Sequence, residues 1–131
     1  MRRGSRQRGQ ETLQAIFTMS FVLIPVLFAT LEIGNMLHLW MGQHAAAAVG
    51  ARVAGEVGED DSTVRDRIDA ELRGVGIEPR NCTISVQPSS VAWHQPITVT
   101  ITSRRHLGVP FLFERDVDLV SSFTTRGEVN H

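Results

Sequence analysis

The stretch GQETLQAIFTMSFVLIPVLFATLEIGNMLHLWMGQHAAAAVGARVAGEVG, residues 9–58, decides the fold. Residues 12–31 carry no charged side chain, and at about 1.5 Å per helical residue they match a bilayer core of about 30 Å. Four arginines and no acids stand within the first nine residues, and basic flanks of this kind stay in the cytoplasm. We therefore expect a membrane anchor over residues 12–31, with the N-terminus cytoplasmic and the C-terminal part outside.

A cleaved secretory signal is the alternative explanation of this stretch. Signal peptides have an apolar region of about 7–15 residues and a small-residue cleavage site soon after it. Here the apolar region is longer, and the alanines at positions 45–48 lie far beyond its end. The proportions favour an anchor over a removable signal.

The helical pattern continues well past the anchor. Between Thr12 and Ala51, Glu32 is the only fully charged residue and Pro25 the only proline, so one helix over residues 10–58 is the economical interpretation. Pro25 lacks an amide hydrogen and should kink this helix. Glu32 falls at the outer membrane interface, where we expect a helix-surface position. The helix is more than twice as long as a bilayer requires, so residues 33–58 must pack on protein.

Small residues recur at every fourth position of this outer half. Rows of this kind allow helix backbones to approach closely and so favour helix packing. The partner is a second chain or this chain's own domain, and both contacts can coexist on opposite sides of one helix. The row consists of Gly42, Ala46, Gly50, Ala54 and Gly58.

A short amphipathic helix is expected next, at the start of a domain over residues 59–131. Ser62 is a suitable N-cap residue for it. Arg65 and Asp69 are spaced to pair on its solvated side. The helix should bury one apolar stripe, made of Val64, Ile68 and Leu72.

From residue 81 the apolar period changes to two. Alternation near residues 82–86, 97–101 and 117–125 predicts three strands of a small antiparallel meander. The connection between the last two strands is too apolar for an idle loop, so it should pack against the sheet or a partner. The apolar residues of this patch are Val109, Phe111, Leu112 and Phe113. The expected fold class is thus α+β: a long kinked transmembrane helix that carries a small head with one short helix and three strands.

Composition argues against several classes of function. The formal net charge of −1 provides no electrostatic footprint for nucleic acid. Cys82 is the only cysteine, so no intrachain disulfide is available, and a buried free thiol is expected. The five histidines do not have metal-ligand spacing, and no phosphate-binding loop, nucleophile elbow or HExxH motif is present. We expect no enzyme activity, cofactor or metal.

The order of these features resembles a known family. RGQETLQ, residues 8–14, resembles a class III prepilin leader, which ends in glycine ahead of an apolar helix. EIGNML (32–37), VGAR (49–52) and PITVTI (96–101) look like the TadE-like minor pilins, or pseudopilins, of tight-adherence (Flp) type IV pili. The likeness covers residues 8–126 in order.

The resemblance implies a structural subunit that serves the assembly of an adhesive bacterial pilus. It implies cleavage between Gly9 and Gln10, which removes the basic leader 1–9 and makes Gln14 the fifth residue, where the family normally has glutamate. The implied partners are the inner membrane, the prepilin peptidase, other pilin or minor pilin subunits and the pilus assembly platform. The implied location is the bacterial inner membrane in a single pass, with later incorporation into a surface pilus.

Two other classes of function stay open at this point. One is a permanently anchored envelope scaffold or binding module that keeps residues 1–9 and uses its sheet edge or the 109–113 patch. The other is a small membrane-tethered enzyme, for which the sequence offers no nucleophile, base or ligand set.

Overall fold

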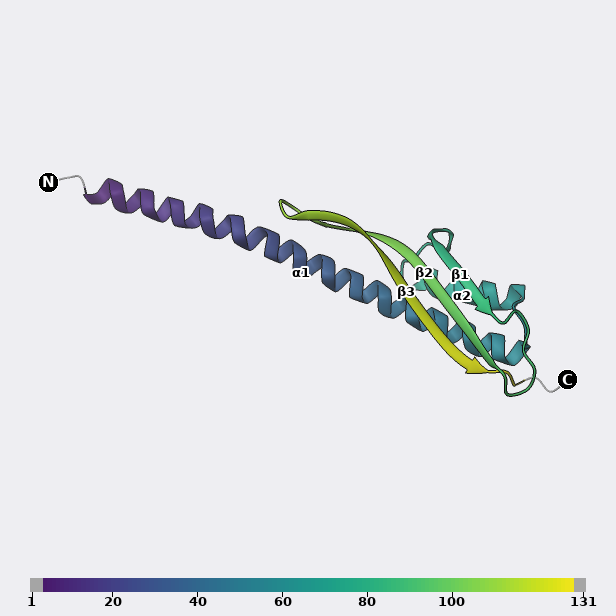
Figure 1. Cartoon of the computed structure of the whole chain (residues 1–131). Helices are drawn as coiled ribbons and strands as arrows, with labels where there is room; N and C mark the ends of the chain where they lie inside the picture. The colour runs from purple at the N-terminus through teal and green to yellow at the C-terminus, as the bar shows by residue number, and fades with distance from the viewer. Residues whose placement is uncertain (1–3, 129–131) are drawn as a thin grey trace.

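The computed structural model describes residues 4–128, which form two helices, one short 3₁₀ turn and three strands. The elements follow the order α1 (Gly4–Val57), α2 (Ser62–Gly74), η1 (Pro79–Asn81), β1 (Cys82–Gln87), β2 (Pro96–Val109) and β3 (Phe113–Arg126) (Figure 1). The expected α+β class is confirmed, and α1 is long and apolar enough to cross a membrane. Residues 1–3 of the predicted basic leader and the C-terminal residues 129–131 lie outside the described residues.

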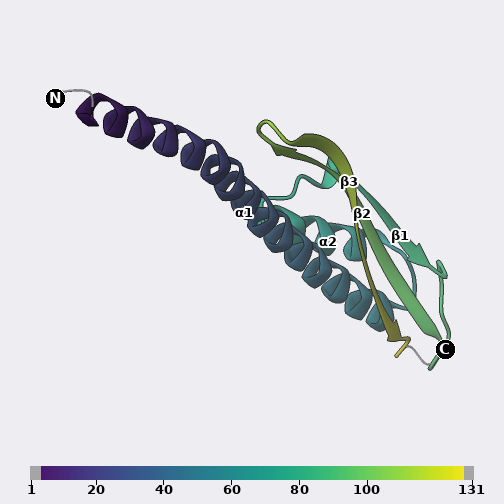
Figure 2. The same cartoon turned by 60° about the vertical axis from the view of Figure 1, so that its left-hand side comes forward.

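The long helix α1 is continuous through Pro25. In Figure 2 it follows a curve without a break at any point. Its N-terminal part extends away from the rest of the molecule, whereas its C-terminal part lies under the sheet and beside α2 (Figures 1 and 2). The head is therefore built on the second half of α1 and is not suspended from its end.

The sheet is an antiparallel meander in the order β1-β2-β3. β1 pairs only with residues 98–103 of β2, whereas β2 and β3 pair along their whole length, from Pro96↔Arg126 to Val109↔Phe113. The predicted strand positions are confirmed, but the strands of this hairpin are much longer than predicted. The turn occupies only residues 110–112, and the hairpin extends along α1 toward its N-terminal half (Figure 1).

Complementary charges explain why the hairpin continues beyond its apolar centre. Arg104 Nε lies 3.6 Å from Asp118 Oδ1 across the two strands, and His106 Nδ1 lies 3.0 Å from Asp116 Oδ1. Cross-strand pairs of opposite charge support a ladder even where no apolar alternation marks it. A prediction from the apolar period alone therefore made both strands too short at the end that carries the turn.

The core lies between the sheet and the two helices. The stripe predicted on α2 is confirmed, because Val64, Ile68 and Leu72 are all completely buried. They meet the inward-facing side chains of β2 and the alanines of α1. The fully buried apolar residues outside α2 are Ala46, Ala47, Ala51, Ala54, Ile77, Ile97, Val99 and Ile101.

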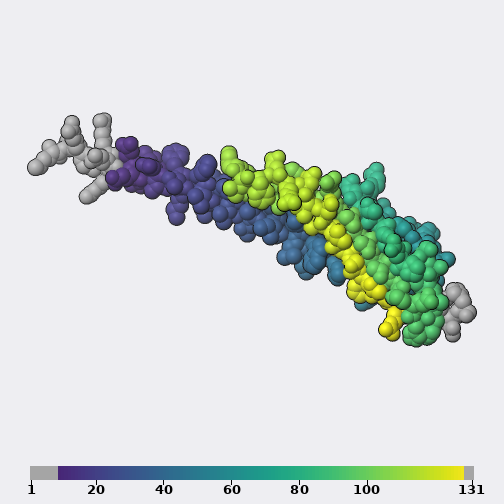
Figure 3. Space-filling model, in the orientation of Figure 1, coloured from purple at the N-terminus to yellow at the C-terminus, as the bar shows by residue number. Residues whose placement is uncertain are grey.

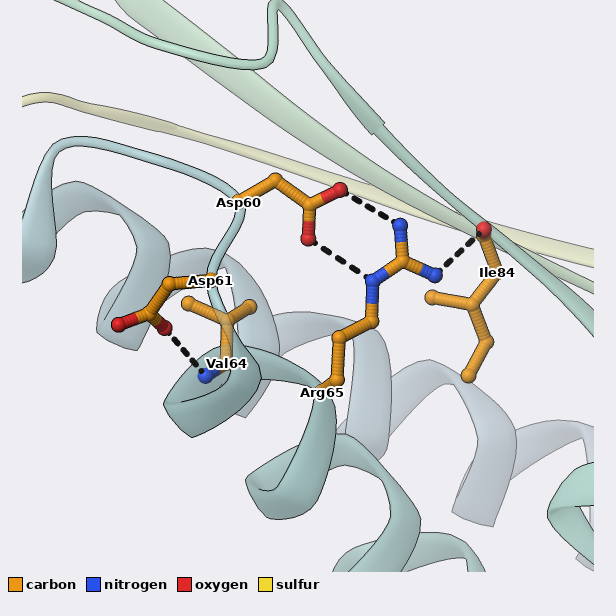
Figure 4. A network of polar contacts seen from close by, with 5 residues as sticks. All are labelled: Asp60, Asp61, Val64, Arg65 and Ile84. Carbon is orange, nitrogen blue, oxygen red and sulfur yellow. Dashed lines mark hydrogen bonds and ion pairs between the residues drawn. The ribbon is translucent and has the colours of Figure 1, made fainter.

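Two aspartates position the start of α2 (Figure 4). Asp61 is the N-cap, and its Oδ1 accepts a hydrogen bond of 3.0 Å from the Val64 amide. The predicted cap, Ser62, is instead the first helical residue, so that prediction was wrong by one position. An aspartate directly before a serine offers the same capping chemistry, which is why the sequence did not separate them.

The predicted pairing of Arg65 with Asp69 was also wrong. Arg65 Nε donates to Asp60 Oδ1 at 2.8 Å, and Arg65 Nη1 donates to the carbonyl of Ile84 in β1 at 3.1 Å (Figure 4). The hydrogen bond with Asp60 holds the pKa of Arg65 above its ordinary value, against partial desolvation. A guanidinium that forks onto a carboxylate and also reaches the sheet links α2 to β1, which a pair within one helix would not do.

Candidate functional site

The first half of α1 is almost bare of protein contacts. We call residues 9–31 the bare half. Large apolar side chains are exposed on all of its sides; Phe17 is 73% exposed and Leu31 is 70% exposed. Soluble proteins rarely expose a continuous apolar surface of this extent, and the helix is long and apolar enough to cross a membrane. The bare half is the candidate functional surface of this chain.

The residues of the predicted cleavage site lie at the beginning of the bare half. Gly9, Gln10 and Gln14 are all exposed and helical, so the Gly9–Gln10 peptide bond lies within α1 in the uncleaved chain. No described atom outside the helix backbone lies within 4 Å of a Cβ built at Gly9. The carbonyl of Gln14 accepts a hydrogen bond of 2.9 Å from Thr18 Oγ1.

The small-residue row packs on this chain's own α2. We call residues 42–57 the packed half of α1; packing was expected from residue 33, but Ile33, Leu37 and Met41 are each more than half exposed. A Cβ built at Gly42 would lie 2.8 Å from Val75 Cβ, and one at Gly50 would lie 2.6 Å from Ile68 Cδ1. Ala46 and Ala54 on the same row are completely buried. The row therefore packs against this chain's own domain and not against a second chain, since α2 occupies the groove that a second helix would need.

Gly58 does not belong to this helix-packing row. α1 ends at Val57, and Gly58 adopts a φ of +84°, the left-handed conformation that closes many helices. Its amide donates to the carbonyl of Ala54 at 2.8 Å, and its own carbonyl accepts from Val91. Gly55 is the additional packing glycine, because a Cβ there would lie 2.9 Å from the backbone oxygen of Arg126.

Gln43 joins the packed half to the sheet, a role that the sequence analysis missed. Its side chain is completely buried. Nε2 donates to the carbonyls of Ile101 at 2.7 Å and Leu119 at 2.9 Å, and Oε1 accepts from Ser103 Oγ. The signal was present: Gln43 stands three residues before Ala46 and seven before Gly50, so it shares their buried face.

The apolar patch predicted between the last two strands forms the tip of the β2–β3 hairpin. Val109 is buried, whereas Phe111 is 78%, Leu112 65% and Phe113 50% exposed. Phe111 has a φ of +66°, the left-handed conformation that residues other than glycine seldom adopt. The ring centroids of Phe111 and Phe21 are 5.7 Å apart, which brings the tip against the bare half of α1.

A cluster of charges surrounds Glu32, which is partly exposed as expected for a helix-surface residue. Glu32 lines a small surface cavity together with Arg105 and His106 of the hairpin. The hydrogen bond with Asp116 raises the pKa of His106 and lowers that of Asp116. This cluster lies where the hairpin approaches the end of the bare half.

The described residues offer no arrangement typical of a metal or thiol centre. Within residues 4–128, no three His, Cys, Asp or Glu side chains are grouped to hold a metal ion. Cys82 is half-buried, and its Sγ lies 3.7 Å from the carbonyl of Glu78. Burial raises the pKa of the Cys82 thiol, which disfavours the reactive thiolate.

Comparison with known proteins adds no relative to this description. No protein-family model matches the chain, and neither the curated proteins nor the solved structures contain a significant match.

Proposed function

We propose that this chain is a structural minor pilin, or pseudopilin, for the assembly of an adhesive tight-adherence pilus. The observation that supports it is the division of α1 into a bare half and a packed half. A subunit stored in a membrane and later packed among other helices needs one apolar helical surface that its own fold leaves uncovered. The leader-like RGQETLQ sequence at the start of that surface provides the second support.

In this proposal, the bare half has two successive partners. Lipid covers it while the subunit is anchored in the inner membrane, and cleavage after Gly9 then removes the basic leader that favours the cytoplasmic side. The assembly platform extracts the shortened helix, and helices of neighbouring subunits replace the lipid. The residues available for such contacts are those of the bare half, since α2 already covers the row at Gly42, Ala46, Gly50 and Ala54.

Gln14 bears on how the mature chain would dock. An amide at this position can hydrogen-bond the terminal amine of a neighbour, but it cannot neutralise it as glutamate would. Glu11 stands one helical turn earlier and supplies a carboxylate close to the new N-terminus. We propose that Glu11 takes over this electrostatic role.

The mature N-terminus tests the proposal. Mass spectrometry of the protein from its own envelope should show a chain that begins at Gln10, with allowance for cyclisation of an N-terminal glutamine. A Gly9→Leu variant should remain uncleaved, while Gly34→Leu, a matched change in an open part of the same helix, should be cleaved normally. If the envelope protein retains residues 1–9, a permanently anchored scaffold replaces the pilin proposal.

A further inference from the structure

The tip of the β2–β3 hairpin lies beside the segment proposed to cross the membrane. Figure 3 shows the hairpin extending over α1 toward its bare half, and Phe111 at the tip meets Phe21. Phe21 precedes Glu32 by eleven residues, or about 16 Å of helix. The tip therefore lies far on the N-terminal side of Glu32, the charged residue that directly follows the uncharged stretch 12–31 of α1.

From the head toward the N-terminus of α1, the hairpin and the helix both become uncharged near the level of Glu32. Glu32 on α1 lines one cavity with Arg105 and His106 on β2. From this level toward the N-terminus, α1 is uncharged over residues 12–31. The hairpin is uncharged over residues 107–113, but Glu114 and Arg115 on β3 lie opposite Gly108 and Leu107, so both strands are free of charge only over residues 109–113. Two elements far apart in the sequence thus become uncharged within about two strand residues of the same level.

We propose that the hairpin tip, residues 109–113, enters the outer leaflet of the bilayer as a second membrane contact beside the anchor. This inference rests on the proposed membrane anchoring of α1. Phe111, Leu112 and Phe113 add their exposed apolar surface to that of Phe21, which is itself 67% exposed. The surface is continuous with the lipid-facing side of the bare half, so the bilayer that covers the helix also covers the tip.

The depth of insertion follows from strand geometry. Phe111 stands three positions before Glu114, so the two residues are at most about 10 Å apart at 3.3 Å per residue, the rise of an extended strand. Phe111 contacts Phe21 about 16 Å below the level of Glu32, so Glu114 would lie about 6 Å or more below that level. Glu114 and Arg115 are exposed and have long side chains, so their charged ends can reach back to the headgroups.

The backbone of the tip is suited to a region of little water. Val109 pairs with Phe113 at the end of the ladder, and the Leu112 amide donates to the Val109 carbonyl at 3.1 Å. Backbone groups that lack partners are costly in hydrocarbon, so a closed turn inserts at lower cost than an open loop. The free strand edges beyond Glu114 limit the insertion to the tip itself.

Depth-dependent fluorescence quenching tests this inference on the full-length chain in phosphatidylcholine vesicles with brominated acyl chains. The probe is Phe111→Trp in a background with Trp40→Phe and Trp93→Phe, and its side chain is exposed, so the fold should tolerate it. Leu23→Trp in the same background reports on the anchor. Native Trp93, kept alone by Trp40→Phe, lies at the opposite end of the hairpin and reports on the aqueous side.

We expect bromine to quench Phe111→Trp to an extent comparable with Leu23→Trp, while Trp93 keeps its fluorescence. If Leu23→Trp is quenched and Phe111→Trp is not, the anchor stands and the inserted tip is wrong. If Phe111→Trp is unquenched but emits at short wavelength, a second copy or another protein covers the tip, which also overturns the inference. If Leu23→Trp escapes quenching too, the membrane anchor itself fails and the proposed function with it.

Discussion

The bare half and the packed half of α1 belong to one continuous helix but meet opposite environments. In the bare half the side chains are large, apolar and exposed, as with Phe17 and Leu31. In the packed half they are small and buried, as with Ala46 and Ala54. Large side chains on all sides of a helix prevent close contact with a small head, whereas glycine and alanine permit it. Side-chain size along one helix thus separates the surface proposed to face the membrane from the structural core.

A large side chain in the packed half should have the largest effect on the difference between the two halves. Gly50→Leu should destabilise the head by about 3 kcal/mol or more, because even the first carbon of the new side chain would overlap Ile68. Urea unfolding of the full-length chain in detergent micelles, followed by near-UV circular dichroism, measures the change.

Gly34→Leu is the matched control, since no described atom outside the helix backbone lies within 4 Å of a Cβ at that position. It should leave the head as stable as in the parent chain and improve the helix propensity slightly. Equal losses in the two variants would show that the packed half does not differ in packing from the exposed middle of α1.

A charge in the bare half should produce the converse effect. Leu23→Asp should cost about 3 kcal/mol for membrane insertion, because an aspartate at the centre of a spanning helix is poorly solvated. The head should stay folded, since Leu23 is 53% exposed. The fraction of protein that resists carbonate extraction measures insertion.

Leu37→Asp places the same charge on an exposed position beyond Glu32 and should leave extraction unchanged. A Leu37→Asp chain that is lost from the membrane as completely as Leu23→Asp would shift the boundary of the anchor outward.

Removing the buried amide of Gln43 tests how much one polar contact contributes to the packed half. Gln43→Ala should destabilise the head by about 2 kcal/mol, because Ser103 Oγ loses its acceptor and two carbonyls lose a donor in the core. Asn35→Ala removes a similar amide from an exposed position of α1 and should change little. Hydrogen exchange at Ile101 and Leu119 would increase in the first variant only; similar rates in both would contradict the assigned role.

The smallest expected effect concerns the cap of α2, the helix that covers the packed half. Asp61→Ala should cost about 1 kcal/mol, because the Val64 amide loses its acceptor. Ser62→Ala should be close to neutral, since Asp61 and not Ser62 accepts from that amide. Denaturant midpoints of the two variants rank them directly, and the reverse ranking would return the cap to Ser62.

Regular periodicity accounts for what was predicted correctly. The stripe of α2 and the centres of the three strands follow from apolar residues at fixed intervals, and both are observed. The extension of the hairpin escaped prediction because it depends on pairs such as His106 with Asp116, whose partners are ten residues apart. The link between Asp60 and Arg65 escaped for a similar reason, since a helical spacing to Asp69 offered an equally plausible local partner.

The candidate site was predicted in its parts but not in its assembly. Gly42 and Gly50 were expected to pack on a helix, yet the choice between α2 and a second chain depends on where the head folds back. Val109 and Phe111 were expected to contact the sheet or a partner. Val109 is buried, whereas Phe111 is exposed. Which side chain points inward depends on strand register, and composition does not specify it.

The sequence by itself determined the long helix, its uncharged N-terminal stretch and the change from large to small side chains, because these are local properties of consecutive residues. The tertiary structure alone decided that α2 occupies the small-residue row, that Gln43 joins helix to sheet and that the hairpin tip meets Phe21. Each of these contacts joins residues far apart in the chain, so each depends on the packing of the whole head.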